Sequence, residues 1–342
     1  MRDRLPFVAA GLFILASLGF VVWFNAVKPR VLVLNSYDNG YSWTRDVVLG
    51  ARRVLDTRPH LAVRWYYMDT KRHPGAEFKT GAGARARRQI EAWRPDVIIA
   101  VDDDAQEYVA RHYVNDPRIH IVFAGVNGEV EPYGYNGAAN VTGILERKPL
   151  QGVKEVIQSI GATRPGGKRV VHIGDTSSSV GKDDKFIRAF DWAPLQLMGS
   201  KLVEDFAQWQ AAVRWANENA DYVITTNYRK LTRSATDQAL VAPEEVVAWT
   251  EANCRLPLIG TNGFFVEDGG MLATGTSPYE QGEVAAEMAL QIIERRRRPA
   301  DIPVQSSRQF VVFTRESSLR EHGIVLPQVY EAFARATNNH YR

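Results

Sequence analysis

The chain has 342 residues, of which 45% are hydrophobic and 24% are charged, as is usual for a globular protein. Its 42 basic and 39 acidic residues nearly balance at a formal net charge of +3, so composition excludes a strongly basic nucleic-acid-binding protein. The single cysteine, Cys254, excludes an intramolecular disulfide, and we expect it to be a buried apolar residue at a helix end.

The N-terminal segment contains an uncharged apolar run from Leu5 to Ala26. At about 1.5 Å per residue, a helix of this length could cross a bilayer. Arg2 and Arg4 precede it and favour export of the rest of the chain. A signal peptidase site needs small residues in an A-x-A pattern, but Phe24 stands two positions before Ala26. We therefore expect residues 1–27 to be a signal peptide or, with better support, an uncleaved anchor that holds a periplasmic protein in the inner membrane through residues 5–26.

Short apolar runs alternate with amphipathic stretches in the first part of the exported chain. The runs are rich in aliphatic and aromatic residues, which is typical of strands, and the stretches between them have helical periodicity. We expect strands at 31–34, 62–67, 97–100 and 121–124, and helices at 44–55, 83–93 and 105–114. This alternation predicts a parallel sheet covered by helices on both faces.

The same alternation continues in the second part. Strands are expected at 170–173, 222–225 and 256–260, and helices at 150–159, 183–190, 204–219 and 243–253. The segment 133–143, rich in Gly, Asn and Ala, is expected to cross between lobes, and 272–276 to cross back into a helix at 281–295. A strand at 310–313 and helices at 317–321 and 326–336 follow. The α/β pattern thus predicts two doubly wound parallel-sheet lobes joined by a hinge: lobe 1 at 28–138 plus part of 276–342, and lobe 2 at 139–275.

Polar and aromatic residues follow several expected strands, where open parallel sheets bind ligands. The clusters lie at 35–43, 102–104, 125–127, 174–179, 226–228 and 261–262. Their mixture of hydroxyls, amides, carboxylates and aromatic rings suits a small solute held between two lobes. The clusters at 102–104 and 175–179 are equally suited to capping the helices that follow them. The aromatic residues Tyr37, Tyr41 and Trp43 are better ligand candidates, although packing against a neighbouring loop explains each of them as well.

Catalytic and metal sites are not expected. Adjacent residues point in different directions, which argues against Mg²⁺ binding by the three aspartates at 102–104. The seven histidines show no metal-ligand spacing, and the serines at 177–179 lack a G-x-S-x-G elbow. We expect His172, inside a strand, to be a core histidine with satisfied polar atoms. The sequence therefore predicts a binding protein without catalytic residues, metal or cofactor.

Several segments resemble a known family. They are VLVLNSYDNGYSWTRDVVLGARRVL (31–55), DVIIAVDDDAQEYV (96–109), IVFAGVN (121–127), NVTGILERKPLQG (140–152), VVHIGDTSSSVG (170–181), SPYEQGEVAAEMALQII (277–293), ADIPV (300–304) and GIVLPQVYEAF (323–333). Their order resembles the ABC-transporter substrate-binding family, whose best-known members take up aromatic amino acids. Sensor ectodomains of some two-component signalling proteins begin similarly.

The resemblance implies the type I periplasmic-binding fold, in which two lobes close on a ligand like a hinge. It also implies ligand contacts from the strand ends of both lobes: Ser36, Tyr37, Tyr41, Trp43, Asp102, Asp103 and Asn127 in lobe 1, and Asp175, Ser177, Asn227 and Asn262 in lobe 2. The chain departs from the usual transport member because it lacks a lipobox cysteine and because its Y-S-W loop resembles the sensor-type relatives.

We therefore expect an extracytoplasmic protein that captures a small solute, such as an amino acid or a related organic molecule, for an ABC importer. Its partners would be the solute, a transporter permease and the membrane. The alternative is an anchored sensing module that signals to a separate membrane partner.

Overall fold

The computed structural model describes residues 5–73, 75–161 and 166–342. The chain forms two compact units, one of Met1–Leu145 with Pro278–Gln305 and the other of Glu146–Ser277 with Ser306–Arg342. The chain therefore passes between the units at 145/146, 277/278 and 305/306. Sequence analysis placed the first two of these crossings at 138/139 and 275/276.

Helix α1 spans Leu5–Ala26, and Arg2 and Arg4 lie outside the described residues. Its described large apolar side chains are exposed, and Phe13, for example, is 73% exposed. Within the ranges that the structure describes, however, no helix is long and apolar enough to cross the hydrocarbon core of a membrane. The expected inner-membrane anchor at residues 5–26 is therefore not supported.

The sheet of the first unit has the strand order β11-β5-β4-β3-β1-β2, and the pairs from β5 through to β2 are parallel. Its strands are β1 (Arg30–Asn35), β2 (Ala62–Tyr67), β3 (Val97–Val101), β4 (His120–Val126), β5 (Val141–Leu145) and β11 (Gln305–Ser306). Every residue of β3 is buried, as expected for a central strand with helices on both faces.

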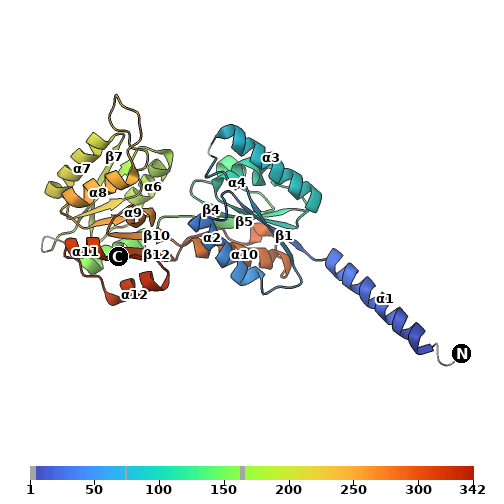
Figure 1. Ribbon diagram of the computed structural model, residues 1–342. Coiled ribbons are helices and arrows are strands. Elements are labelled where there is room, and N and C mark those ends of the chain that lie inside the picture. The colour runs from blue at the N-terminus through green and yellow to red at the C-terminus, as the bar shows by residue number, and fades with distance from the viewer. Residues whose placement is uncertain (1–4, 74, 162–165) are drawn as a thin grey trace. The chain divides into compact units, whose positions relative to one another are not determined.

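Helices cover both faces of this sheet (Figure 1). The helical segments are α2 (Ser42–Leu55), α3 (Ala76–Trp93), α4 (Asp103–Tyr108), α10 (Pro278–Ile293), η2 (Ala110–Tyr113), η3 (Glu131–Tyr133) and η4 (Pro299–Asp301). Successive residues of β1 point to opposite faces: Val31 and Val33 pack with α2 and α10, whereas Leu32 and Leu34 pack with α3 and α4.

Two glycines allow α2 and α10 to touch backbone to backbone. A Cβ atom at Gly50 would lie 2.0 Å from the carbonyl oxygen of Tyr279, and one at Gly282 would lie 1.8 Å from that of Val47. Because real Cβ atoms do not approach other atoms so closely, both positions need glycine. This contact attaches α10, which follows the second unit in sequence, to the first unit.

The sheet of the second unit has the strand order β13-β12-β10-β9-β8-β6-β7. Only the β10–β12 pair is antiparallel among the described strands of this sheet. Its strands are β6 (Arg169–Asp175), β7 (Gln196–Val203), β8 (Tyr222–Thr225), β9 (Leu258–Gly260), β10 (Leu272–Thr276), β12 (Phe310–Arg315) and β13 (His340–Tyr341).

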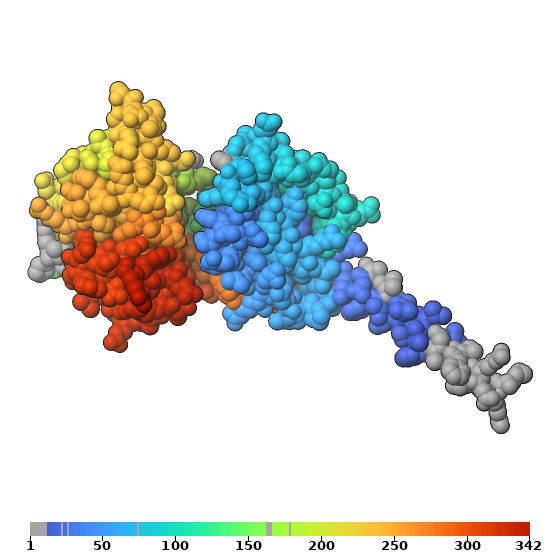
Figure 2. Space-filling view, in the orientation of Figure 1, coloured from blue at the N-terminus to red at the C-terminus, as the bar shows by residue number. Residues whose placement is uncertain are grey.

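A continuous apolar core fills the second unit, with Trp209 and Phe265 among its largest buried side chains. Cys254 is buried directly after α8, which confirms its expected place at a helix end. The C-terminal residues, coloured red, form a continuous part of this unit's surface (Figure 2). The helices are α5 (Leu150–Ile160), α6 (Ser178–Ala189), α7 (Phe206–Asn219), α8 (Pro243–Asn253), α9 (Phe264–Glu267), α11 (Glu316–Glu321) and α12 (Gln328–Ala336).

The structure contains several strands that sequence analysis did not assign: β5, β7, β11 and β13, together with β10 in the segment 272–276 that was expected to cross between lobes. Sequence analysis assigned part of 141–145 to a crossing segment, but β5 pairs with β4, and Gly143 lies against the backbone and ring of Phe123. Strand β7 was not expected, because Gly199, Ser200 and Lys201 interrupt its apolar pattern. It is an edge strand, where pairing on one side only tolerates such residues.

Candidate functional site

The carboxyl end of the first sheet brings Trp43 and Asp102 together. Asp102 follows β3 and is 3% exposed, and the indole nitrogen of Trp43 donates to its Oδ1 at 2.9 Å. Asp102 has a φ of 66°, which is uncommon for a residue other than glycine. The neighbouring Gly125 also has a φ of 66°, and a Cβ there would lie 2.8 Å from Asp102 Oδ1. Gln281 of α10 accepts a hydrogen bond from the Gly125 amide at 2.8 Å. The two predicted residues are thus held by a tightly packed, polar strand end.

Tyr37 and Tyr41 form an aromatic pair beside Lys71. Their ring centroids lie 5.6 Å apart in an edge-to-face arrangement. The Lys71 ammonium is 5.0 Å from the Tyr37 ring centroid and 5.2 Å from that of Tyr41, a favourable cation–π distance. Burial, followed by the negative charge of Asp102, raises the pKa of Tyr37 well above its usual value. The predicted aromatic residues therefore lie together with a cation that sequence analysis did not select.

The three consecutive aspartates point to different partners, as expected. Asp102 accepts from Trp43, Asp103 accepts from the Tyr133 hydroxyl at 2.7 Å, and Asp104 is 2.9 Å from the Lys79 ammonium. No group of acidic, histidine or cysteine side chains in the described part of the chain could hold a metal ion. Asp103 therefore takes part in a tyrosine contact rather than in a carboxylate cluster.

Two predicted residues of the first unit make local hydrogen bonds. Ser36 is fully buried, and its hydroxyl donates to Val101 O at 2.7 Å and accepts from the Ala105 amide at 2.7 Å. This ties β1 to β3 and to helix α4. The Asn127 side chain is half-buried and donates to Gly125 O at 3.4 Å.

In the second unit, three predicted residues hold the loops that follow β6 and β8. The Asp175 carboxylate accepts from the amide of Ser177 at 2.9 Å, from its hydroxyl, and from the amide of Lys230 at 3.1 Å. Asn227 Oδ1 accepts from the amides of Tyr228 at 3.0 Å and Arg229 at 3.2 Å. These side chains fix the shape of the carboxyl edge of the sheet.

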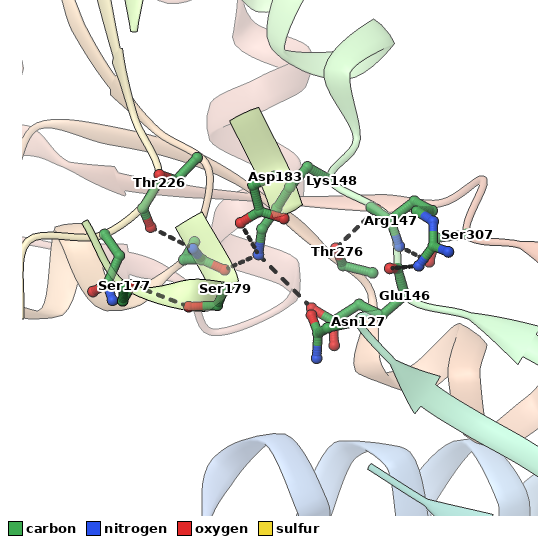
Figure 3. A network of polar contacts seen from close by, with 12 residues as sticks. Asn127, Glu146, Arg147, Lys148, Ser177, Ser179, Asp183, Thr226, Thr276 and Ser307 are labelled. Atoms are coloured by element: carbon green, nitrogen blue, oxygen red, sulfur yellow. Dashed lines mark hydrogen bonds and ion pairs between the residues drawn. The ribbon is translucent and has the colours of Figure 1, made fainter. Parts of the chain in front are cut away.

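Asn262 contacts a lysine that sequence analysis missed. The ammonium of Lys148 donates to Asn262 Oδ1 at 2.8 Å, and the Asn262 amide donates to Thr226 O at 2.8 Å. Two carboxylates, those of Glu146 and Asp183, lie 3.8 Å and 3.9 Å from the ammonium (Figure 3). The Lys148 side chain is only 8% exposed. In the sequence, only the short polar segment that follows β5 indicates that Lys148 could belong to the site.

His172 lies under this edge as a satisfied core residue, as expected. One ring nitrogen is 3.1 Å from Asp184 Oδ1 and the other is 3.0 Å from the Thr226 hydroxyl. Burial alone would raise the pKa of Asp184, but the contacts of its carboxylate with His172 and Arg188 hold it well below its usual range. The histidine thus fixes Thr226, whose carbonyl orients Asn262.

A buried acid beside the same edge anchors the loop after β8. Asp268 is 9% exposed, accepts from the Tyr228 hydroxyl at 2.6 Å and pairs with Arg229 at 2.7 Å. The Arg229 guanidinium lies 4.5 Å from the Phe264 ring centroid. Burial, followed by Asp268, raises the pKa of Tyr228.

The fold is similar to that of several solved structures. A conserved domain protein from Vibrio cholerae is 17% identical, with a TM-score of 0.60, and the match covers 92% of this chain and 100% of that chain. A ligand-free, open substrate-binding protein with adhesive properties from Clostridium difficile is 15% identical, with a TM-score of 0.65, and the match covers 87% of this chain and 96% of that chain. An ABC domain in complex with L-Trp from Streptococcus pneumoniae is 16% identical, with a TM-score of 0.54, and the match covers 89% of this chain and 98% of that chain. These likenesses show an α/β fold with two parallel-rich sheets, as in type I periplasmic binding proteins.

A family model agrees with the fold, although no curated protein sequence matches the chain. The model of the ABC transporter substrate binding protein family matches residues 69–337, which is well over half of the chain. The match includes the strand ends of Asp102, Asn127, Asp175 and Asn262. The chain therefore belongs to the ABC transporter substrate binding protein family.

Proposed function

We propose that this protein is an extracytoplasmic solute-binding protein that captures a small organic solute, such as an amino acid, for an ABC importer. The observation that carries the proposal is the set of polar and aromatic residues at the carboxyl edges of the two sheets. Each unit presents polar groups on rigid strand ends, and the first unit adds Tyr37, Tyr41 and Trp43. Open α/β sheets bind ligands at this edge. Membership of a substrate-binding family supports the same role and an extracytoplasmic location.

The residues divide into those that shape the edge and those that remain candidates for ligand contact. Ser36, Asp175 and Asn227 have their polar atoms in loop and capping hydrogen bonds. Tyr37 and Tyr41 offer ring surface, because aromatic rings supply a large contact area with little loss of side-chain freedom.

A thermal-shift screen of the purified protein against amino acids and small organic acids tests the proposal. A solute present at about 100 times its Kd is expected to stabilise the folded protein by about 2.7 kcal/mol. Isothermal titration should give one site per chain, and mass spectrometry should recover the solute chemically unchanged.

A variant pair tests the location of the site. Tyr37→Leu is expected to weaken binding of the solute found by the screen. Tyr330→Leu, which removes a half-buried tyrosine from α12 instead, is expected to leave binding unchanged. A screen without any stabilising solute, or equal effects of the two variants, would contradict the proposal.

A further inference from the structure

Strand β2 differs from the other edge strands because it lacks the features that normally prevent further pairing. The two sheets that the structure describes end in β11 and β2 and in β13 and β7. Strands β11 and β13 are only two residues long. Strand β7 is longer, but its register against β6 shifts between Val170 and His172, and Gly199 in the shifted segment has a φ of 111°. Short strands and bulges hinder the addition of another strand, so these three edges are protected.

Strand β2, by contrast, is regular over all six of its residues and pairs with β1 in unbroken parallel register. The amides of Ala62 and Met68 donate to carbonyl oxygens on the β1 side at 2.8 Å and 2.9 Å. In a parallel ladder, alternate residues bond to the same neighbouring strand, so the even-numbered residues of β2 face β1. The backbone N–H and C=O groups of Val63, Trp65 and Tyr67 therefore point away from the sheet, and no described residue is hydrogen-bonded to them.

The side chains of β2 do not protect this edge either. Its one charged residue is Arg64, whose guanidinium lies 4.5 Å from the ring centroid of Trp93 in α3 and so lies along one face of the sheet. On the other face, Trp65 packs against the core, and the guanidinium of Arg52 lies 4.7 Å from its ring centroid. The strand contains neither proline nor lysine, the residues that commonly prevent edge pairing.

A second copy of β2 fits this edge in one register. A two-fold axis makes the two strands antiparallel, and residues directly opposite each other share a face of the joined sheet. With Trp65 opposite Trp65 of the second copy, Val63 lies opposite Tyr67, and every outward amide and carbonyl of both strands has a partner. Arg64 then lies opposite the aromatic ring of Tyr66. The register that places Arg64 opposite itself leaves outward groups unpaired and brings like charges together.

We infer that two copies of this chain associate through β2, which joins their first-unit sheets into one continuous sheet. None of the candidate ligand residues lies in β2, so this inference is independent of the proposed function and goes beyond it. An extended segment of a different protein is the alternative occupant of the edge. The second copy is favoured because its own sequence pairs every outward group and keeps the two Arg64 side chains from lying opposite each other.

Sedimentation velocity of the full chain measures this association. A mild detergent covers the exposed apolar side chains of α1, and α1 is the same in all variants. We expect the wild-type chain to shift from monomer to dimer as its concentration rises from about 1 to about 100 μM. Larger species are not expected, because a two-fold contact is closed and the other sheet edges are protected.

Three variants locate the contact. Val63→Pro removes an outward N–H group and no hydrogen bond to β1, so the dissociation constant of the dimer should rise at least about tenfold. Trp65→Lys places two ammonium groups opposite each other and should weaken the dimer to a similar extent. Met198→Lys is the matched control, because it adds the same charge at an exposed position, 41% accessible, on the edge strand β7. This control should associate like the wild-type chain.

Each contrary outcome overturns the inference. A wild-type chain that stays monomeric up to about 100 μM has no such contact, and its β2 edge would be left for a strand of another protein. Wild-type association in both β2 variants, or an equal loss in Met198→Lys, would place the contact elsewhere. Circular dichroism and urea unfolding show whether each variant folds. If Val63→Pro does not fold, Trp65→Lys decides the matter.

Discussion

Replacing Gly282 by alanine tests how the first unit is held together. The added Cβ would lie 1.8 Å from Val47 O, 2.8 Å from Val47 C and 2.9 Å from Ala51 N. All three are backbone atoms of α2, so no side chain can swing aside and the two helices must separate. Their separation would loosen the packing of buried residues such as Ala285 and Ala286.

The expected loss follows from two opposing contributions. Overpacking of a close contact costs about 3 kcal/mol at the upper end of its usual range. The better helix propensity of alanine offsets about 1 kcal/mol. The net loss of about 2 kcal/mol in the free energy of unfolding corresponds to a Tm lower by roughly 4–8 °C for a domain of about 150–250 residues.

Urea unfolding followed by circular dichroism and tryptophan fluorescence measures this loss. Gly81→Ala in α3 is the matched control, because its Cβ would meet only the flexible end of Arg85, at 3.3 Å. It should be neutral or slightly stabilising. If Gly282→Ala is as stable as Gly81→Ala, the two helices do not touch backbone to backbone and the reasoning is refuted.

Three further predictions concern the second unit. The Glu251 carboxylate, 2.9 Å from the His322 ring, raises the pKa of that histidine. The stabilisation by this ion pair is therefore fully present below the usual pKa of about 6.5 and is lost as pH rises through the folded-state pKa. His322→Gln should destabilise the protein more at pH 5.5 than at pH 8.5 in urea titrations, and equal losses would contradict this. Burial raises the pKa of Cys254 to about 12, so its thiol should react with iodoacetamide at pH 8 only after the protein unfolds. Mass spectrometry measures the labelling, and rapid labelling of the folded protein would contradict this prediction. Tyr228→Phe should lower the free energy of unfolding by about 1–3 kcal/mol, because the buried Asp268 carboxylate loses one hydrogen-bond donor. A loss below about 0.5 kcal/mol would contradict this and would show that Arg229 alone satisfies the carboxylate.

Apolar runs revealed the inner strands well, because central strands of parallel sheets must be apolar along their length. The inner strand Tyr222–Thr225 has the bounds expected from sequence, and so does the edge strand Ala62–Tyr67. Strand β5 escaped notice because Gly143 makes the segment resemble a turn. Its glycine is required by the close approach of Phe123, a contact between segments that no local pattern contains.

The candidate site could be located from sequence only as far as the strand ends. Strand-end reasoning placed Asp102, Asp175 and Asn262 at the sheet edges, where the structure has them. It could not show that the Asp175 carboxylate also accepts from the Lys230 amide, because Lys230 lies far away in sequence. Lys148 was missed because a lysine in a polar loop normally indicates solvent, and its burial follows only from tertiary packing.

The attachment of α10 to α2 also has a consequence for synthesis on the ribosome. The first unit is completed only by residues Pro278–Gln305, which emerge after the whole segment Glu146–Ser277. Until then, the face of α2 around Val47 and Ala51 lacks its contact with α10, and the Gly125 amide lacks its acceptor Gln281. The N-terminal part of the first unit therefore keeps apolar surface exposed while the whole second unit is being synthesised, even though it is made first.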